Sequence, residues 1–213
     1  MSRLIDMSLN EFSDVLASDT PAPGGGSTAA YEGALGASLI GMVASLSVGR
    51  KKYAEHESFM RDAVKRAEVL RTKMLDIVDR DTEAYNLAYA VFSMPKDTDE
   101  QKAARSAAMQ TALKTCTLTP FELIDCAVKT LELASEMVGK YNINAISDLG
   151  VAVLSLKTAA QGAWLNMLVN LDGLHDDGFV AEYRKSGSEH VVKAAELADE
   201  IYADVLNNLI PEA

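Results

Sequence analysis

The chain has 213 residues, of which 48% are hydrophobic and 24% are charged, and this composition fits one ordinary globular domain. Two cysteines and three histidines are too few for a disulfide scaffold or a zinc domain, so we expect no metal site. Thirty-one acidic residues against twenty basic ones give a formal net charge of −11. Because such a chain repels phosphates, nucleic acid is not expected as a partner.

The N-terminus and the cysteines indicate a compartment. The first ten residues hold no apolar run long enough for a signal peptide, because Asp6 interrupts them. Cys116 and Cys126 are ten residues apart, which fits neither a redox motif nor a zinc pair. We therefore expect two buried, reduced thiols in a cytoplasmic protein.

A short helix and a break are predicted near the N-terminus. Ser8 and Glu11 have the spacing of a capping box, which predicts a helix over residues 8–17. The stretch 19–26 reads DTPAPGGG and cannot be helical, because it combines prolines with three glycines.

The next predicted helix is long and apolar. Ser27 is expected to be its N-cap, and the helix is predicted to end near Val48. Its length would cross a bilayer. Its Ala, Gly and Ser content instead favours a buried helix of a bundle, and we expect no membrane association.

Helical periodicity continues to the C-terminus. Thr119 and Pro120 have the pattern of a new helix start, and Asn144 or Ser147 is expected to cap a later helix. No alternating strand pattern is present. The sequence therefore predicts one all-α domain over residues 1–213, a multi-helix antiparallel bundle whose remaining helices cover residues 57–92, 100–118, 119–138, 147–171 and 187–210.

Two helices carry stripes of small residues on one face. One stripe runs from Ala29 to Ser45 at intervals of four, and the other runs from Asp148 to Asn166 in steps of three and four. Small residues let helix backbones approach closely, within one chain or across a dimer. They also leave room for a flat ligand, so both interpretations stay open.

Three charged residues are candidates for chemistry. Asp81 lies on an otherwise apolar stripe, where a carboxylate has a raised pKa or forms an ion pair with a neighbouring helix. Asp148 begins the second small stripe, where it is either functional or a partner of the helix dipole. Lys51 belongs to the densest basic run, Arg50 to Lys52, which also suits a helix end. The glycines at 24–26 offer exposed backbone N–H groups for an anion or a polar ring.

Five ordered motifs resemble the cyclodeaminase/cyclohydrolase family of folate enzymes. They are PAPGGGSTAA at 21–30, GRKKY at 49–53, DTEAY at 81–85 with MPK at 94–96, NINAISDLGV at 142–151 and GAWLNMLVNL at 162–171. The resemblance implies a helical bundle, a homodimer and a tetrahydrofolate derivative as substrate, with no prosthetic group.

The resemblance also implies roles for individual residues. Lys51 and Asp81 are expected to form the catalytic acid–base pair in one shared hollow near the glycine turn, which either one chain or two subunits could form. Asp148 is expected to assist them, together with Asn142 and Asn144, by holding the pterin or the reacting nitrogens. The remaining expected substrate-binding residues are Pro23, Gly24, Gly25, Gly26, Ser27, Arg50, Tyr85, Ser147 and Asn166.

The implied reaction is the cyclodeamination of 5-formimino-tetrahydrofolate to 5,10-methenyl-tetrahydrofolate and ammonia. The alternative is hydrolysis of the methenyl compound to 10-formyl-tetrahydrofolate. Both need proton transfer but neither needs a metal or a covalent nucleophile. A non-catalytic folate-binding bundle and a purely structural helical dimer are the two hypotheses from other classes.

Overall fold

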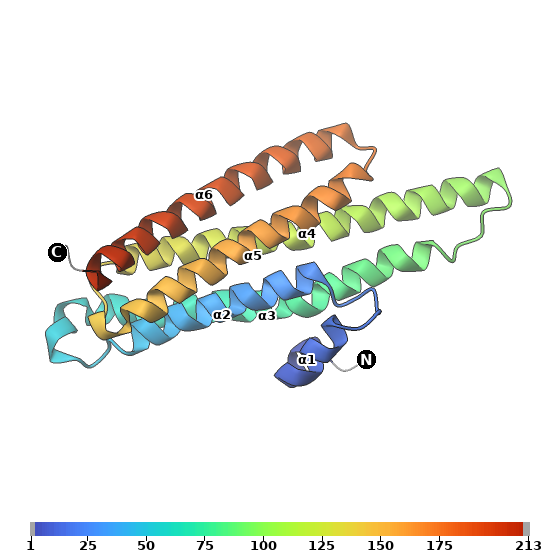
Figure 1. The fold of residues 1–213 in the computed structure, drawn as a ribbon. Helices are drawn as coiled ribbons and strands as arrows, with labels where there is room; N and C mark the ends of the chain where they lie inside the picture. Colours follow the sequence, from blue (N-terminus) through green and yellow to red (C-terminus); the bar gives the residue numbers. More distant parts are fainter. Residues whose placement is uncertain (1–2, 211–213) are drawn as a thin grey trace.

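The computed structural model describes residues 3–210, and in this range every regular element is a helix (Figure 1). This confirms the predicted all-α class. Three short 3-10 helices accompany the main ones, at Leu4–Asp6, Lys51–His56 and Ile143–Ala145. The six α-helices are α1 (Leu9–Leu16), α2 (Gly25–Ser45), α3 (Glu57–Val91), α4 (Asp99–Met137), α5 (Ile146–Asp172) and α6 (Asp177–Leu209).

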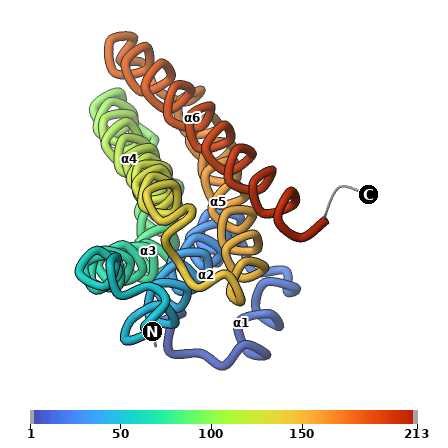
Figure 2. Tube along the Cα trace, turned by 90° about the vertical axis from the view of Figure 1, so that its left-hand side faces the viewer, coloured from blue at the N-terminus to red at the C-terminus, as the bar shows by residue number. Residues whose placement is uncertain are grey.

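Four long helices surround the core. Helix α2 contacts α3 and α5, and α4 contacts the same two helices, so that the four close into a ring of antiparallel neighbours (Figures 1 and 2). Helix α6 packs on the outside of α4 and α5. Helix α1 lies to one side, where the Phe12 ring is 5.7 Å from the ring of Tyr31 in α2.

The two small-residue stripes pack against each other. A Cβ added to Gly33 of α2 would lie 3.2 Å from the Cβ of Ala159 in α5. A Cβ added to Gly162 of α5 would lie 3.0 Å from the Cβ of Ala29. The backbones of α2 and α5 are thus too close for larger side chains, and these stretches of the stripes serve helix packing.

The expected break at residues 119–120 is wrong, because α4 runs unbroken through Pro120. A proline has no N–H for the carbonyl four residues earlier, which is that of Cys116. The side-chain amide of Asn170 in α5 donates to this carbonyl at 2.7 Å. The hydrogen bond that proline removes is therefore replaced from another helix.

The last helix begins ten residues before the expected Gly187. Asp176 caps it by accepting a hydrogen bond from the Phe179 N–H at 3.0 Å. Gly187 lies inside the helix, where an added Cβ would be 2.5 Å from the Trp164 ring. This glycine makes room for tryptophan and does not mark a helix start.

Two cap predictions also fail, and one succeeds. Helix α2 starts at Gly25, so that Ser27 lies inside it. Asn142 caps the 3-10 turn before α5 by accepting from the Asn144 N–H at 3.2 Å, and Ala145 precedes α5 itself. The capping box of Ser8 and Glu11 is confirmed, and α3 matches its predicted range.

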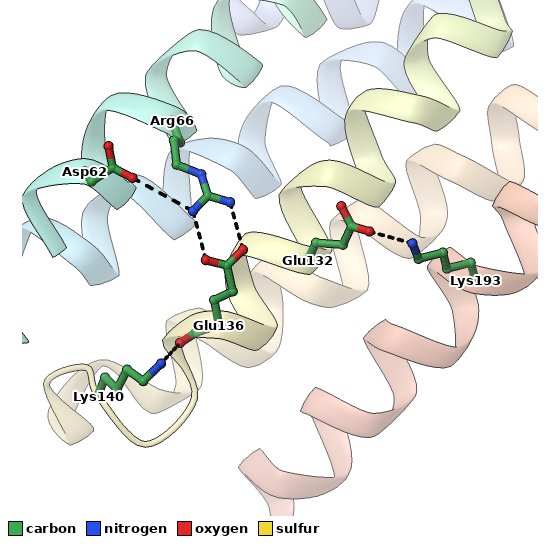
Figure 3. A network of polar contacts seen from close by, with 6 residues as sticks. All are labelled: Asp62, Arg66, Glu132, Glu136, Lys140 and Lys193. Carbon is green, nitrogen blue, oxygen red and sulfur yellow. Dashed lines mark hydrogen bonds and ion pairs between the residues drawn. The ribbon is translucent and has the colours of Figure 1, made fainter. Parts of the chain in front are cut away.

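An ion-pair network joins three helices on the surface opposite α2 (Figure 3). Arg66 of α3 donates two hydrogen bonds of 2.9 Å to Glu136 of α4. Lys193 of α6 pairs with Glu132 of α4. These side chains are partly exposed, so each pair contributes about 0–1 kcal/mol to stability.

One stretch, Ile143–Asp172, is long and apolar enough to cross a membrane by length and composition. Half of its most apolar window is buried inside the bundle. Five exposed large apolar side chains lie in this stretch, those of Ile143, Val151, Leu154, Leu165 and Val169.

Candidate active site

A pocket of about 310 Å³ opens where the glycine turn meets α3, α4 and α5. We call it the glycine pocket. Gly24 is the N-cap of α2 and has no side chain to cap the first turn, so the first N–H groups of the helix are left as donors. The lining residues are Pro21, Ala22, Gly24, Gly25, Gly26, Asp81, Ala84, Tyr85, Cys116, Asn166, Val169 and Asn170.

Asp81 lies directly over the backbone of α2. A Cβ added to Gly26 would be 2.1 Å from Asp81 Oδ1 and 2.5 Å from its carboxyl carbon. No real side chain fits at such distances. Position 26 must therefore be glycine, because the missing side chain leaves the space through which the Asp81 carboxylate reaches the pocket.

Ser27 holds the Asp81 carboxyl group by a hydrogen bond. It is completely buried, and its Oγ lies 3.1 Å from Asp81 Oδ2 and 2.9 Å from the Val78 carbonyl. Burial raises the pKa of Asp81, and the hydrogen bond from Ser27 opposes that rise. Asp81 is thus a carboxyl group whose proton affinity is shifted toward the neutral range, where acid–base catalysis is efficient.

The other walls are amides, an aromatic ring and a thiol. Asn166 donates to the Gly162 carbonyl at 2.9 Å, and its amide lies 3.5 Å from the position of a Cβ at Gly25. Tyr85 is partly exposed, one turn beyond Asp81. Burial, and then the charge of Asp81, raise the pKa of the Cys116 thiol to about 11, so it is neutral and poorly nucleophilic.

The other residues that were predicted to be catalytic or to bind substrate lie at the opposite end of α2, which we call the lysine end. The Asn142 N–H donates to Ser47 Oγ at 2.8 Å, and its side-chain amide donates to the Leu46 carbonyl at 3.3 Å. The Ile143 N–H donates to Tyr53 Oη at 3.1 Å. The residues of the lysine end are Arg50, Lys51, Asn142, Asn144, Ser147 and Asp148.

Lys51 and Asp81 do not share a hollow within the single chain, so the expectation of one joint site is wrong for the chain by itself. Helix α2 has 21 residues, and its ends are about 30 Å apart at 1.5 Å per residue. Asp81 lies against Gly26 at the first end, and Lys51 follows the second. The lysine end is exposed at Arg50, Lys51, Asn144 and Ser147.

Some residues that were predicted to bind substrate lie behind the wall of the pocket, and some residues of the wall were not predicted. Pro23 and Ser27 are buried beneath the glycine pocket and do not line it. Cys116 and Asn170 line it and escaped the sequence analysis. Asn170 stands four residues after Asn166, and that spacing on one helix face was a usable indication.

Comparison with known proteins identifies the family. A family model described as formiminotransferase-cyclodeaminase matches residues 8–189. The chain is 40% identical to a methenyltetrahydrofolate cyclohydrolase of Methylorubrum extorquens over 197 residues, which are 92% of this chain and 95% of that protein. It is 32% identical to the formimidoyltransferase-cyclodeaminase of Rattus norvegicus over 85% of this chain, which spans only 34% of the rat protein.

A solved structure agrees with these matches. The crystal structure of formiminotetrahydrofolate cyclodeaminase from Thermotoga maritima superposes with a TM-score of 0.80 and 26% sequence identity. The alignment covers 97% of this chain and 98% of that one. By sequence and by fold, the chain therefore belongs to the formiminotransferase-cyclodeaminase family.

Proposed function

We propose that the protein is an enzyme that transfers protons at the one-carbon unit of a tetrahydrofolate, with Asp81 as the acid–base group. The observation that carries the proposal is the position of Asp81. It is a partly buried carboxyl with a raised pKa, in a pocket beside the first turn of α2, whose N–H groups receive no hydrogen bond from an N-cap side chain. The names of the relatives supply the substrate class.

The reaction we propose first is hydrolysis of 5,10-methenyl-tetrahydrofolate. The relative that matches along 95% of its length is named for this activity. Asp81 as carboxylate would take a proton from the attacking water as its oxygen adds to the methenyl carbon. The protonated carboxyl would then deliver that proton to N5 as the bond from the carbon to N5 breaks. The hydroxyl proton leaves to solvent, and 10-formyl-tetrahydrofolate results.

Cyclodeamination of 5-formimino-tetrahydrofolate is the second candidate, and the structural neighbour favours it. In this reaction N10 would attack the formimino carbon, and the departing nitrogen would leave as ammonia after it is protonated. The same carboxyl could serve, because both reactions proceed through a tetrahedral carbon between nitrogens and both require protonation of a leaving nitrogen.

Two absorbance assays separate these activities. Accelerated loss of methenyl absorbance from 5,10-methenyl-tetrahydrofolate indicates the hydrolase, and its appearance from 5-formimino-tetrahydrofolate indicates the deaminase. Replacement of Asp81 by asparagine is expected to lower turnover by about 10²- to 10⁴-fold. A fully active Asp81→Asn variant would remove Asp81 from the mechanism, and absence of both activities would refute the proposed function.

The proposal includes a homodimer, because no Lys or Arg among residues 3–210 lines the glycine pocket. Exposed large apolar side chains run along neighbouring faces of α2 and α5. On each helix they are three, four, seven or eleven residues apart and so lie on one face, which is the pattern of a seam that another helix covers. They are Leu35, Met42 and Leu46 on α2, and Val151, Leu154, Leu165 and Val169 on α5.

A second copy fits this face for reasons of geometry and charge. A two-fold axis near Leu35, the middle of α2, would pair the helices of the two copies antiparallel. Because the glycine pocket and the lysine end lie on opposite sides of Leu35, each pocket would receive the lysine end of the partner. The partner's Lys51 would then stand beside the acidic group at position 81.

A mixing experiment tests whether the site is shared. Lys51→Ala and Asp81→Asn proteins are each expected to be inactive, and they are unfolded together and refolded together. If Lys51 and Asp81 act from different protomers, half of the dimers are mixed and each has one intact site, which restores about a quarter of the wild-type activity. If the mixture stays as inactive as its components, the shared site is excluded.

A further inference from the structure

Behind the wall of the glycine pocket, three oxygen atoms of α3 converge on one hydroxyl group of α2. Ser27 Oγ lies 2.9 Å from the Val78 carbonyl oxygen, 3.1 Å from Asp81 Oδ2 and 3.1 Å from Thr82 Oγ1. Ser27 is completely buried, so bulk water does not reach this group. Thr82 follows Asp81 in the DTEAY motif, and the function proposed above gives it no role.

The hydrogen atoms available fix the direction of the contact between the two hydroxyl groups. A hydroxyl has one hydrogen to donate and two lone pairs with which to accept. The Val78 carbonyl can only accept, and so can the Asp81 carboxylate. The single Ser27 hydrogen serves one of these two acceptors at a time, so it is not free for Thr82. Thr82 is therefore the donor, and Ser27 Oγ accepts from it.

The protonation of Asp81 decides which acceptor Ser27 serves. When Asp81 is ionised, Ser27 donates to Oδ2. When Oδ2 carries a proton, Asp81 donates to Ser27 Oγ, and Ser27 donates to the Val78 carbonyl. Val78 tolerates the loss of this bond in the ionised state, because its carbonyl also accepts the N–H of residue 82 within the helix. Donation from Thr82 is the one contact that both states keep.

The Thr82 side chain has no competing contact. A helical threonine commonly donates to the carbonyl four residues earlier, as Thr117 and Thr130 of α4 do. For Thr82 that carbonyl belongs to Val78, which takes its side-chain hydrogen bond from Ser27 instead. Within residues 3–210, the contact with Ser27 is the only hydrogen bond of the Thr82 hydroxyl. The hydroxyl is thus committed to Ser27.

We propose that Thr82 is a positioning residue for Asp81, acting through Ser27 to favour the carboxylate form that accepts a proton. This inference rests on the proposed function, because it takes Asp81 to be the acid–base group. Donation from Thr82 polarises the Ser27 hydroxyl, since hydrogen bonds in a chain strengthen one another. The strengthened bond from Ser27 stabilises the carboxylate. Thr82 thereby adds to the hydrogen bond that opposes the effect of burial on the pKa of Asp81.

The other neighbours of Asp81 contribute little charge. Among the described residues that line the glycine pocket, the other titratable side chains are Tyr85 on the same helix and Cys116 on α4. The pKa of Cys116 is raised to about 11, so its thiol is neutral while Asp81 titrates. Helix α5 contributes Asn166 and Asn170, which carry no charge, and α2 lines the pocket with glycines. The pKa of Asp81 is therefore a direct measure of the hydroxyl chain behind it.

The test is a carbon-13 NMR titration of the Asp81 carboxyl carbon in the ligand-free protein, whose signal is assigned by its loss in Asp81→Asn. Thr82→Val keeps the shape of the side chain and removes the hydroxyl. It is expected to raise the pKa of Asp81 by about 0.3–0.7 unit, which is about two- to fivefold in proton affinity. Thr82→Ser retains a hydroxyl and should restore the wild-type value. Thr72→Val makes the same change at an exposed position of α3 and is the matched control.

A second set of variants tests whether Thr82 acts through Ser27. Ser27→Ala removes the donor itself and is expected to raise the pKa of Asp81 by about one unit. In that background Thr82→Val should add nothing, because the chain is already broken. A further shift there would overturn the proposal. So would an unchanged pKa in a Thr82→Val protein that circular dichroism shows to be folded, and Thr82→Ala gives the same measurement if the valine variant does not fold.

Kinetics extend the test to the reaction. In the hydrolysis proposed first, Asp81 begins as a carboxylate, so the acid limb of kcat/KM against pH should move upward in Thr82→Val by the same amount as the pKa. A merely structural role would lower the rate equally at every pH. A wild type without folate activity refutes the proposed function but leaves the NMR titration valid. An active wild type whose acid limb does not move in Thr82→Val refutes the role of Thr82 alone.

Discussion

The side-chain amide of Asn170 donates at 2.7 Å to the carbonyl of Cys116, the backbone group that Pro120 leaves without its helical partner. This contact joins α5 to α4 at the one proline inside an α-helix of residues 3–210. Asn170 also lines the glycine pocket, so the same residue supports a helix and forms a wall of the candidate site.

A double-mutant cycle tests this replacement. Asn170→Ala is expected to destabilise the protein by about 1–3 kcal/mol, because the Cys116 carbonyl loses its donor. In a Pro120→Ala background the restored N–H can take over, so the same change is expected to cost less. Urea unfolding of the four proteins gives the coupling energy. Additive effects would show that Asn170 does not compensate for the proline.

Gly26→Ala is expected to damage activity more than stability. The new Cβ would overlap the Asp81 carboxyl, which has to turn away, so we expect a loss of turnover of about a hundredfold or more. Gly41→Ala in the same helix is the control. Its Cβ would meet only Ala67 at 3.5 Å, and alanine should stabilise the helix by about 0.5–1 kcal/mol. Parallel kinetics and melting curves compare the two variants, and equal activity would contradict the close approach of Asp81.

The raised pKa of Asp81 predicts how stability depends on pH. Because the folded state binds this proton more tightly than the unfolded state, the contribution of Asp81 is greatest below the unfolded pKa of about 3.9. It is lost as pH rises through the folded pKa. Asp81→Asn should therefore gain stability relative to the wild type as pH rises from about 4 toward neutrality. Urea midpoints for both proteins across this range measure the difference. Parallel curves would mean that burial does not raise the pKa of Asp81.

Leu154→Asp is expected to separate the proposed dimer. Leu154 is 43% exposed on α5, and in a two-fold interface one substitution introduces two charges. We expect the dimer Kd to rise by about a hundredfold or more and activity to fall with it. Leu209→Asp, at 49% exposure near the end of α6, is the control. Sedimentation velocity gives the oligomeric state, and an unchanged sedimentation coefficient for Leu154→Asp would place the interface elsewhere.

Local patterns predicted most of the fold. The capping box at Ser8 and the helical period of α3 depend on residues within a few turns of each other, and both were confirmed. The boundaries at Pro120 and Gly187 failed because distant residues determine them. Asn170 supplies the donor that Pro120 removes, and Trp164 occupies the space beside Gly187. Nothing near either position in the sequence indicates these partners.

The candidate site was predictable in part. The glycine motif and Asp81 come together as expected, since α2 and α3 are neighbours along the chain. The separation of Lys51 from Asp81 was already implied by the predicted helix over 27–48, because a helix of that length keeps its two ends about 30 Å apart.

The partial burial of Asp81 has a consequence for the timing of proton transfer. If the methenyl substrate binds as proposed, its amidinium cation would stabilise the carboxylate, so the substrate itself would prepare the base that activates the attacking water. Hydrolysis removes that cation, and the carboxyl would regain its affinity for a proton. In each turnover Asp81 would therefore lose its proton when the reactant binds, and it would take up a proton again once the product has formed.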